Sequence, residues 1–233
     1  MDRRQVNENR GSIVKSVTLL GRGPSLKYLN VLPESEIVVL ANDFDTEISQ
    51  IKELSDYLKK QTIHLVLNMV VHNANGYNAI NFFTEFNVVK LIRPYLNGIR
   101  VPGSSGQSIP LEENFLGDNH KEFMFQGGLK YPYDYAGTGL AAFAYTMLDT
   151  KADVVNVLGL DFYDNLKYGN PNYLVNDKDG RDFVRDFWKP EDMQENVCKL
   201  VNGRPDVQVN LHTICKNFIG GMEDIQNLNI IKY

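Results

Sequence analysis

Short apolar runs alternate with amphipathic segments along this chain of 233 residues. Six runs rich in β-branched residues have few polar interruptions: Ser16–Leu20, Ile37–Ala41, Ile63–Leu67, Val88–Ile92, Val154–Leu158 and Val207–Leu211. Such runs are typical of strands buried on both faces, as in a parallel sheet. Helical patterns lie between them, over Thr46–Lys60, Thr138–Leu148 and Glu191–Val201. The alternation predicts an α/β fold with right-handed crossovers.

The other segments predict how the chain is organised. Residues 1–15 form a polar N-terminal tail, and residues 16–233 form one domain. Turn residues fill Pro102–Pro110, which we expect to be a loop. A polar and aromatic segment without a helical or strand period covers about residues 164–190. A connection of that length inside a compact domain is typical of an active-site lid.

The first predicted strand is followed by a glycine turn with the sequence Gly21-Arg22-Gly23-Pro24-Ser25. In open parallel sheets, ligands bind beyond the carboxyl ends of the strands. Glycines let the backbone approach a ligand closely, and Pro24 suits the first position of a helix whose free N–H groups face an anion. The turn therefore predicts a phosphate or nucleotide site. Its spacing matches the dinucleotide fingerprint only in part, because Leu26 replaces the third glycine, although Asp43 stands where a ribose-binding acid would.

Polar residues also follow the next two predicted strands. Asn42 and Asn68 stand at these positions, where an amide can bind a base edge or a sugar hydroxyl or can simply form a turn. Asp43 and Asp45 form a DxD pattern, which either holds a metal on a diphosphate or caps a predicted helix; we favour the cap.

Two later segments complete the candidate site. Thr138 and Gly139 open an alanine-rich helix, where small residues permit close approach of a ligand. A buried strand leads through Gly159 and Asp161 to Tyr163, and Tyr168 follows. Phenol groups at these positions could donate hydrogen bonds to a departing phosphate, or they could pack beneath the lid.

Composition narrows the class of protein. The net charge of −5 gives no overall positive field for nucleic acid. Cys198 and Cys215 lack a CxxC pattern and nearby histidines, so we expect two reduced, buried thiols and no zinc site. The tail lacks the apolar core of a signal peptide, and no apolar run reaches the roughly 20 residues of a membrane span. We therefore expect a soluble, cytoplasmic protein without a transmembrane segment.

Taken together, the motifs resemble the bacterial lipooligosaccharide sialyltransferases of glycosyltransferase family 42. The resemblance rests on Leu20–Lys27, Asn42, Thr138–Gly139 with its helix, and Gly159–Tyr163, in the family's order. It covers roughly Val17 to Tyr168, about two-thirds of the chain. The Thr138–Gly139 segment is also similar to the small sialylmotif of animal sialyltransferases.

This resemblance implies a single Rossmann-like domain of the GT-A type with a mostly parallel central sheet, helices on both faces and a lid. It implies inverting transfer of sialic acid from CMP-sialic acid, the nucleotide-sugar donor, to a hydroxyl of a glycan acceptor, with no cofactor and no metal. Tyr163 and Tyr168 would stabilise the leaving phosphate. The nucleotide and donor would be held by Gly21, Arg22, Gly23, Pro24, Ser25, Asn42, Asn68, Thr138, Gly139, Gly159 and Asp161.

The chain departs from the family pattern at three points. Arg22 stands where the family has asparagine, and arginine lacks the acceptor of an amide. The spacing from Tyr163 to Tyr168 is one residue shorter than the family's. The family's histidine base falls near Trp188–Lys189, where this chain has no histidine. A base must accept the proton of the acceptor hydroxyl. His212 is the best-placed substitute, and the other candidates are Glu191, Asp192 and Asp186.

Two other functions stay open from the sequence. Flagellin-glycosylation proteins and archaeal-type pterin diphosphokinases share a similar glycine turn, and a diphosphokinase would need ATP and magnesium, held by Asp43, Asp45 and Asp161. A nucleotide-binding module without catalysis would fit the missing histidine. The acceptor, the linkage and the oligomeric state are not determined by the sequence, and a homo-oligomer is among the options.

Overall fold

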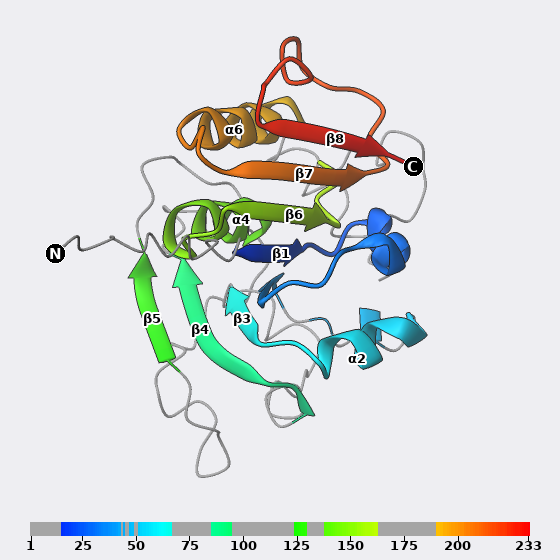
Figure 1. Cartoon of the computed structure of the whole chain (residues 1–233), viewed down its shortest axis with the longest axis vertical. Helices are drawn as coiled ribbons and strands as arrows, with labels where there is room; N and C mark the ends of the chain where they lie inside the picture. The colour runs from blue at the N-terminus through cyan, green and yellow to red at the C-terminus, as the bar shows by residue number, and fades with distance from the viewer. Residues whose placement is uncertain are drawn as a thin grey trace, which may run out of the picture.

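The computed structural model is an α/β fold built on one eight-stranded sheet (Figure 1). It describes residues 15–42, 44, 47–48, 51–66, 85–94, 124–129, 138–162 and 190–233. The strands are β1 (Ser16–Leu20), β2 (Ile37–Ala41), β3 (Ile63–Val66), β4 (Val88–Pro94), β5 (Met124–Leu129), β6 (Val154–Leu158), β7 (Gln208–Thr213) and β8 (Leu228–Lys232). The helices are the 3₁₀ helix η1 (Pro24–Val31), α2 (Lys52–Leu58), α4 (Thr138–Asp149) and α6 (Pro190–Asn202).

The order of the strands creates a switch point at the centre of the sheet. The order is β5-β4-β3-β2-β1-β6-β7-β8, and every pair of neighbouring strands is parallel. From β1 the chain builds outward through β2, β3 and β4 to β5, and it then returns through α4 to place β6 on the other side of β1. In such sheets, ligands bind where the carboxyl ends of the strands diverge at this reversal. The carboxyl ends of β1 and β6 are therefore the expected location of a site.

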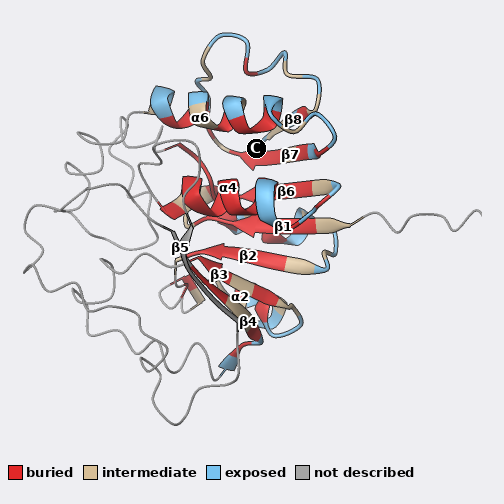
Figure 2. Cartoon of the chain, turned by 90° about the vertical axis from the view of Figure 1, so that its left-hand side faces the viewer, coloured by how far each residue is buried: buried red, intermediate tan, exposed pale blue. Residues whose placement is uncertain are grey.

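Alternating residues of the strands point to opposite faces, and each face packs against its own helices. Val17 and Leu19 of β1 belong to the core cluster that contains α4 and α6. Leu20 belongs to the cluster that contains η1 and α2. Figure 2 shows the buried residues concentrated in the strands and α4, whereas α6 keeps an exposed outer side. Helices thus cover both faces, as predicted.

A row of polar side chains crosses β6, β7 and β8 on one face of the sheet. Asn156, Asn210 and Asn229 stand side by side in the strand register. The Asn210 amide donates to Asn156 at 2.9 Å, and Asn156 in turn donates to the Ser16 hydroxyl at 3.3 Å. These bonds satisfy Asn156, whose side chain is buried.

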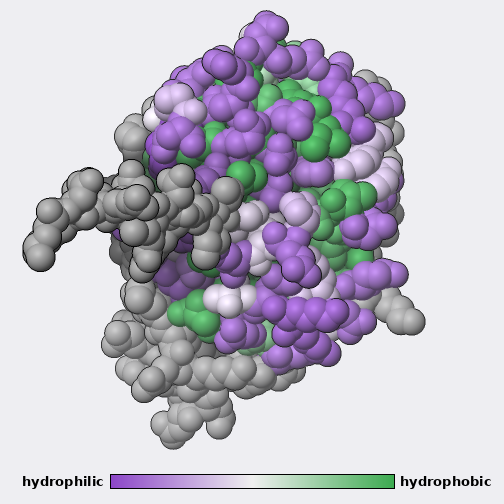
Figure 3. Space-filling view, viewed as in Figure 1, coloured by the Kyte–Doolittle hydropathy of each residue, from purple (hydrophilic) through white to green (hydrophobic). Residues whose placement is uncertain are grey.

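The face seen in Figure 3 is mainly hydrophilic, with smaller hydrophobic patches between the polar residues.

Most of the predicted elements are confirmed. β1, β2 and β6 have the predicted bounds, and β3, β4, β7, α4 and α6 differ from prediction only at their ends. The predicted loop at Pro102–Pro110, residues 1–14 of the predicted tail and residues 164–189 of the predicted lid lie outside the described residues. Pro190, the last position of the predicted lid, begins α6.

Three predictions about the elements were wrong or incomplete. The single helix expected over Thr46–Lys60 is interrupted at Ile51, which is extended (φ −112°, ψ 98°), so that α2 begins only at Lys52. β5 and β8 were not predicted, because Gly127 and Gly128 weaken the strand pattern of β5 and only two β-branched residues stand between Asn229 and Lys232 in β8. The helix expected to begin at Pro24 is present but is a 3₁₀ helix.

Candidate functional site at the switch point

The loops after β1 and β6 are joined beyond the ends of their strands. The backbone N–H of Gly21 donates to the Leu158 carbonyl at 2.7 Å, and that of Gly23 donates to the Gly159 carbonyl at 2.8 Å. A Cβ atom at Gly21 or at Gly159 would lie within 3.0 Å of the other residue's carbonyl oxygen, which real Cβ atoms do not tolerate. The two loops therefore require glycine at both positions.

Ser25 ties the start of η1 to the same junction. Its side chain is completely buried, and its hydroxyl oxygen accepts a hydrogen bond from the Gly159 N–H at 2.8 Å. Pro24 precedes it at the first position of η1, as the sequence predicted. Ser25 therefore holds η1 to the β6 loop, which is a structural use of a residue expected to bind a nucleotide.

Asp161 connects three strand ends through one carboxylate. One oxygen accepts from the Ser25 N–H at 2.8 Å, and the other accepts from the Thr213 hydroxyl at 2.8 Å and the Ile214 N–H at 3.1 Å. The residue is 5% exposed. Since a buried carboxylate is stable only when hydrogen-bonded, these three donors explain an acid at this position. We call the set Gly21, Gly23, Ser25, Gly159, Asp161 and Thr213 the Asp161 clamp.

Left-handed backbone conformations gather beside the clamp. Asn42 at the end of β2 has φ 69°, Gly159 has φ 79°, and Phe162 just after Asp161 has φ 52°. Asparagine adopts this region more readily than most residues, whereas a buried phenylalanine there is an outlier. Such strain persists where the surrounding structure holds the backbone in place, often beside functional sites. The asparagine at position 42 therefore fits the backbone of its turn.

Arg22 and the start of α4 complete the described surroundings. The Arg22 Nε donates to Glu47 at 2.6 Å, and Glu47 is completely buried. The guanidinium therefore compensates a buried charge that would otherwise be costly. Gly139 lies where an added Cβ would be 3.2 Å from Leu160, and Thr138 beside it is 6% exposed. The predicted α4 residues and the β6 loop are therefore neighbours in the structure.

His212, the predicted substitute base, lies close to the clamp but does not join it. It precedes Thr213 on β7, and adjacent strand residues point to opposite faces. The side chain is 6% exposed, and Nδ1 lies 2.7 Å from the Tyr233 hydroxyl. Burial lowers the pKa of His212, so the imidazole is neutral at pH 7. Both the burial and this hydrogen bond reduce its access to an acceptor sugar.

Two of the other candidate bases lie among the described residues. Glu191 and Asp192 are exposed in the first turn of α6, where acids interact favourably with the helix dipole. Several predicted residues lie outside the described residues: Asn68, Tyr163, Tyr168, Asp43, Asp45 and Asp186. Within the described ranges, no cluster of three or more histidine, cysteine or acidic side chains could hold a metal ion.

A polar pair that no sequence motif indicates joins β3 and α4. The Tyr145 hydroxyl lies 2.9 Å from His64 Nδ1, and Lys90 Nζ lies 5.1 Å from the centre of the Tyr145 ring. Burial, then the charges of Lys90 and Lys15, lowers the pKa of His64 to about 4. Burial raises the pKa of Tyr145, so Tyr145 donates and neutral His64 accepts. The only sequence signal was the histidine that interrupts the apolar run Ile63–Leu67.

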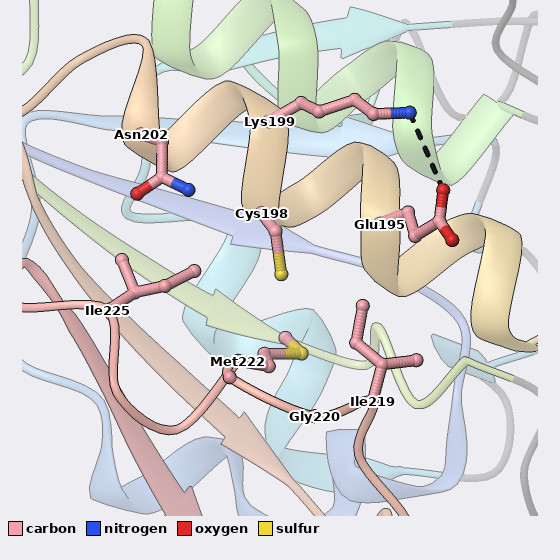
Figure 4. Close-up of a pocket in the computed structure, with 9 residues that line it drawn as sticks. Glu195, Cys198, Lys199, Asn202, Ile219, Gly220, Met222 and Ile225 are labelled. Atoms are coloured by element: carbon pink, nitrogen blue, oxygen red, sulfur yellow. Dashed lines mark ion pairs between the residues drawn. The ribbon is translucent and has the colours of Figure 1, made fainter.

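A hollow lies away from the switch point, between α6 and the connection from β7 to β8 (Figure 4). Its volume is about 300 Å³, and Cys198 points from α6 toward Met222 across it. Burial raises the pKa of the Cys198 thiol, which therefore stays protonated and unreactive near pH 7. Both cysteines are free thiols as expected, but only Cys215 is buried and Cys198 is half-buried.

Comparisons with known proteins leave the fold and site as the basis for assigning a function. No protein-family model, curated protein or solved structure matches the chain. No helix in the described part of the chain is long and apolar enough to cross a membrane.

The close approach of the two loops predicts a large cost for adding a methyl group to them. We expect Gly159→Ala to lower the free energy of unfolding by about 3 kcal/mol or more, since a clash is added to a left-handed backbone. The matched control is Gly220→Ala, where a Cβ would meet nothing within 4 Å, and we expect a change below about 0.5 kcal/mol. Equal stabilities of the two variants in urea unfolding would contradict this packing.

The His64–Tyr145 pair predicts a particular pH dependence. Because the pKa of His64 is lower in the folded state than its unfolded value of about 6.5, the unfolded chain takes up the proton first. The contribution of the neutral His64 imidazole to the free energy of unfolding is complete above pH 6.5 and is lost as the pH falls toward 4. An NMR titration should give His64 a midpoint near 4, assigned by the loss of its signal in His64→Gln. A midpoint near 6.5 would refute the buried, neutral imidazole.

Proposed function

We propose that the chain is a sialyltransferase-like glycosyltransferase on a Rossmann-like domain of the GT-A type. It would transfer sialic acid from CMP-sialic acid to a sugar hydroxyl, with inversion and without a metal. The observation that carries this proposal is the Asp161 clamp. It joins Gly21–Ser25 and Gly159–Asp161, the two segments most similar to the family, at the switch point of a parallel sheet.

The clamp supports donor binding by fixing backbone at the carboxyl ends of the central strands. Gly21–Ser25 after β1, Asn42 after β2 and Thr138–Gly139 at the start of α4 come from three separate segments. The Asp161 clamp holds the first, and Leu160 next to it contacts the third. Rigid loops of this kind suit a nucleotide, because little ordering entropy is lost on binding.

The reaction needs help for the leaving group and a base for the acceptor. We assign the first role to Tyr163 and Tyr168, whose phenols would donate hydrogen bonds to the departing phosphate of CMP. For the base, Glu191 and Asp192 are exposed, whereas His212 is buried and bonded to Tyr233. Since a base must reach the acceptor hydroxyl, exposure favours the carboxylates over His212.

One observation bears on the magnesium-dependent diphosphokinase alternative. Asp161, the only one of its three candidate ligands among the described residues, already accepts three hydrogen bonds. A metal there would have to replace donors that hold the β1, β6 and β7 ends together. This favours the metal-independent reaction.

Calorimetry with CMP, CDP, UDP, ATP and NAD, with and without magnesium, tests the proposal. Tight CMP binding that is independent of magnesium, together with transfer of sialic acid that is lost in Tyr163→Phe, is the expected result. CMP binding without transfer would support the non-catalytic module. Magnesium-dependent binding of ATP, or no CMP binding, would overturn the sialyltransferase assignment.

Two substitutions of Asn42 separate its amide from its backbone. We expect Asn42→Ala and Asn42→Gly both to weaken CMP binding by about 10-fold, since each removes an amide that bonds the nucleotide. Glycine tolerates the left-handed conformation of residue 42 and alanine does not. Normal CMP affinity in Asn42→Gly would show that Asn42 serves only the turn.

A further inference from the structure

A stack of three rings links η1 to the last two strands of the sheet. Tyr28 of η1 and Tyr233, which follows β8, lie with ring centres 4.2 Å apart and planes 20° apart. Tyr233 is also nearly parallel to His212 of β7, at 6.0 Å and 16°. We call Tyr28, Tyr233 and His212 the aromatic stack. Figure 1 shows the C-terminus beside η1, at the carboxyl ends of the strands.

Polar contacts fix Tyr233 within this stack. Its hydroxyl lies 2.7 Å from His212 Nδ1, and its backbone N–H donates to the Thr213 carbonyl at 3.1 Å. Burial raises the pKa of Tyr233 and lowers that of His212, so the phenol donates to a neutral imidazole. Thr213 also belongs to the Asp161 clamp. The stack therefore contacts η1 at Tyr28, and the clamp contacts it at Ser25. Strand β7 contributes one residue to each, His212 to the stack and Thr213 to the clamp.

The shape of η1 agrees with this arrangement. Its backbone is non-helical at Tyr28 (φ −96°, ψ 23°), in the middle of the element. A short 3₁₀ helix has poor hydrogen-bond geometry and depends on tertiary contacts for its stability. Leu26 and Leu29 anchor one side of η1 in the core, and the aromatic stack secures Tyr28.

We propose that Tyr28 and Tyr233 are positioning residues for the glycine turn: by holding η1 against β7 and β8, they keep Gly21–Ser25 in the conformation that binds the donor nucleotide. This rests on the proposed function for the identity of the ligand. The thermodynamic consequence is reciprocal. Breaking the stack weakens nucleotide binding, and bound nucleotide stabilises the stack.

The test compares two substitutions of Tyr233 with a control on β8, the strand that Tyr233 follows. Tyr233→Leu removes the ring, and we expect its Kd for CMP to rise about 3- to 10-fold, the range of an aromatic pair. KM for the sugar donor should rise equally with kcat unchanged. Tyr233→Phe keeps the ring, so it should retain most of the affinity. Ile230→Ala weakens β8 through the opposite face of the sheet and should leave Kd unchanged.

Hydrogen exchange tests the stack without any ligand. Amide exchange of Leu26 and Leu32, which bond within and just after η1, should be faster in Tyr233→Leu and Tyr28→Leu than in Ile230→Ala. The double variant should be no faster than either single variant, since both remove the same contact. Unchanged exchange, or additive effects, would overturn the proposal. Absence of CMP binding by the unaltered protein would overturn the proposed function, whereas the exchange result alone decides whether the stack holds η1.

Discussion

The Asp161 carboxylate is the contact on which the centre of this molecule depends. It accepts hydrogen bonds from Ser25, Thr213 and Ile214, which stand 136, 52 and 53 residues away in sequence. A hydrogen bond to a charged group contributes about 1.5–3 kcal/mol, and a buried carboxylate without donors costs more than that. The folded state therefore keeps all three strand ends in place together. The same junction includes the bond from η1 to the loop after β6 and the close approach of Gly21 and Gly159.

The clamp changes how the family-like motifs are understood. A glycine turn and a late Gly-Leu-Asp segment suggest ligand binding, yet three hydrogen bonds here join the two segments to each other. The segments are linked because each completes the other's hydrogen bonds. Structural and functional roles do not compete at such a site, since a nucleotide binds best to backbone that is already fixed. Under the proposed function, the nucleotide would contact Arg22, Asn42 and the start of α4 beside the clamp.

The sequence was informative where a local pattern determines the structure and silent where distant residues do. Short apolar runs with at most one polar interruption predicted β1, β2 and β6, and an apolar segment rich in small residues predicted α4. No glycine or proline lies near Ile51, so the sequence does not indicate the break in the helix expected over Thr46–Lys60. The bonds from Asp161 to Thr213, and from His64 to Tyr145, join residues 52 and 81 positions apart, and a single sequence contains no signal for such pairing. The function remains a proposal that rests on the clamp and the resemblance.

The free energy of unfolding of Asp161→Asn tests this account most directly. Asparagine has the same shape but only one accepting oxygen, so it cannot serve all three donors. If the carboxylate holds the strand ends together, urea unfolding will show a loss of about 3 kcal/mol or more relative to the unaltered protein. A variant within about 0.5 kcal/mol of the unaltered protein would contradict the clamp. The role of Asp161 would then be to bind the proposed nucleotide and not to hold the strand ends together.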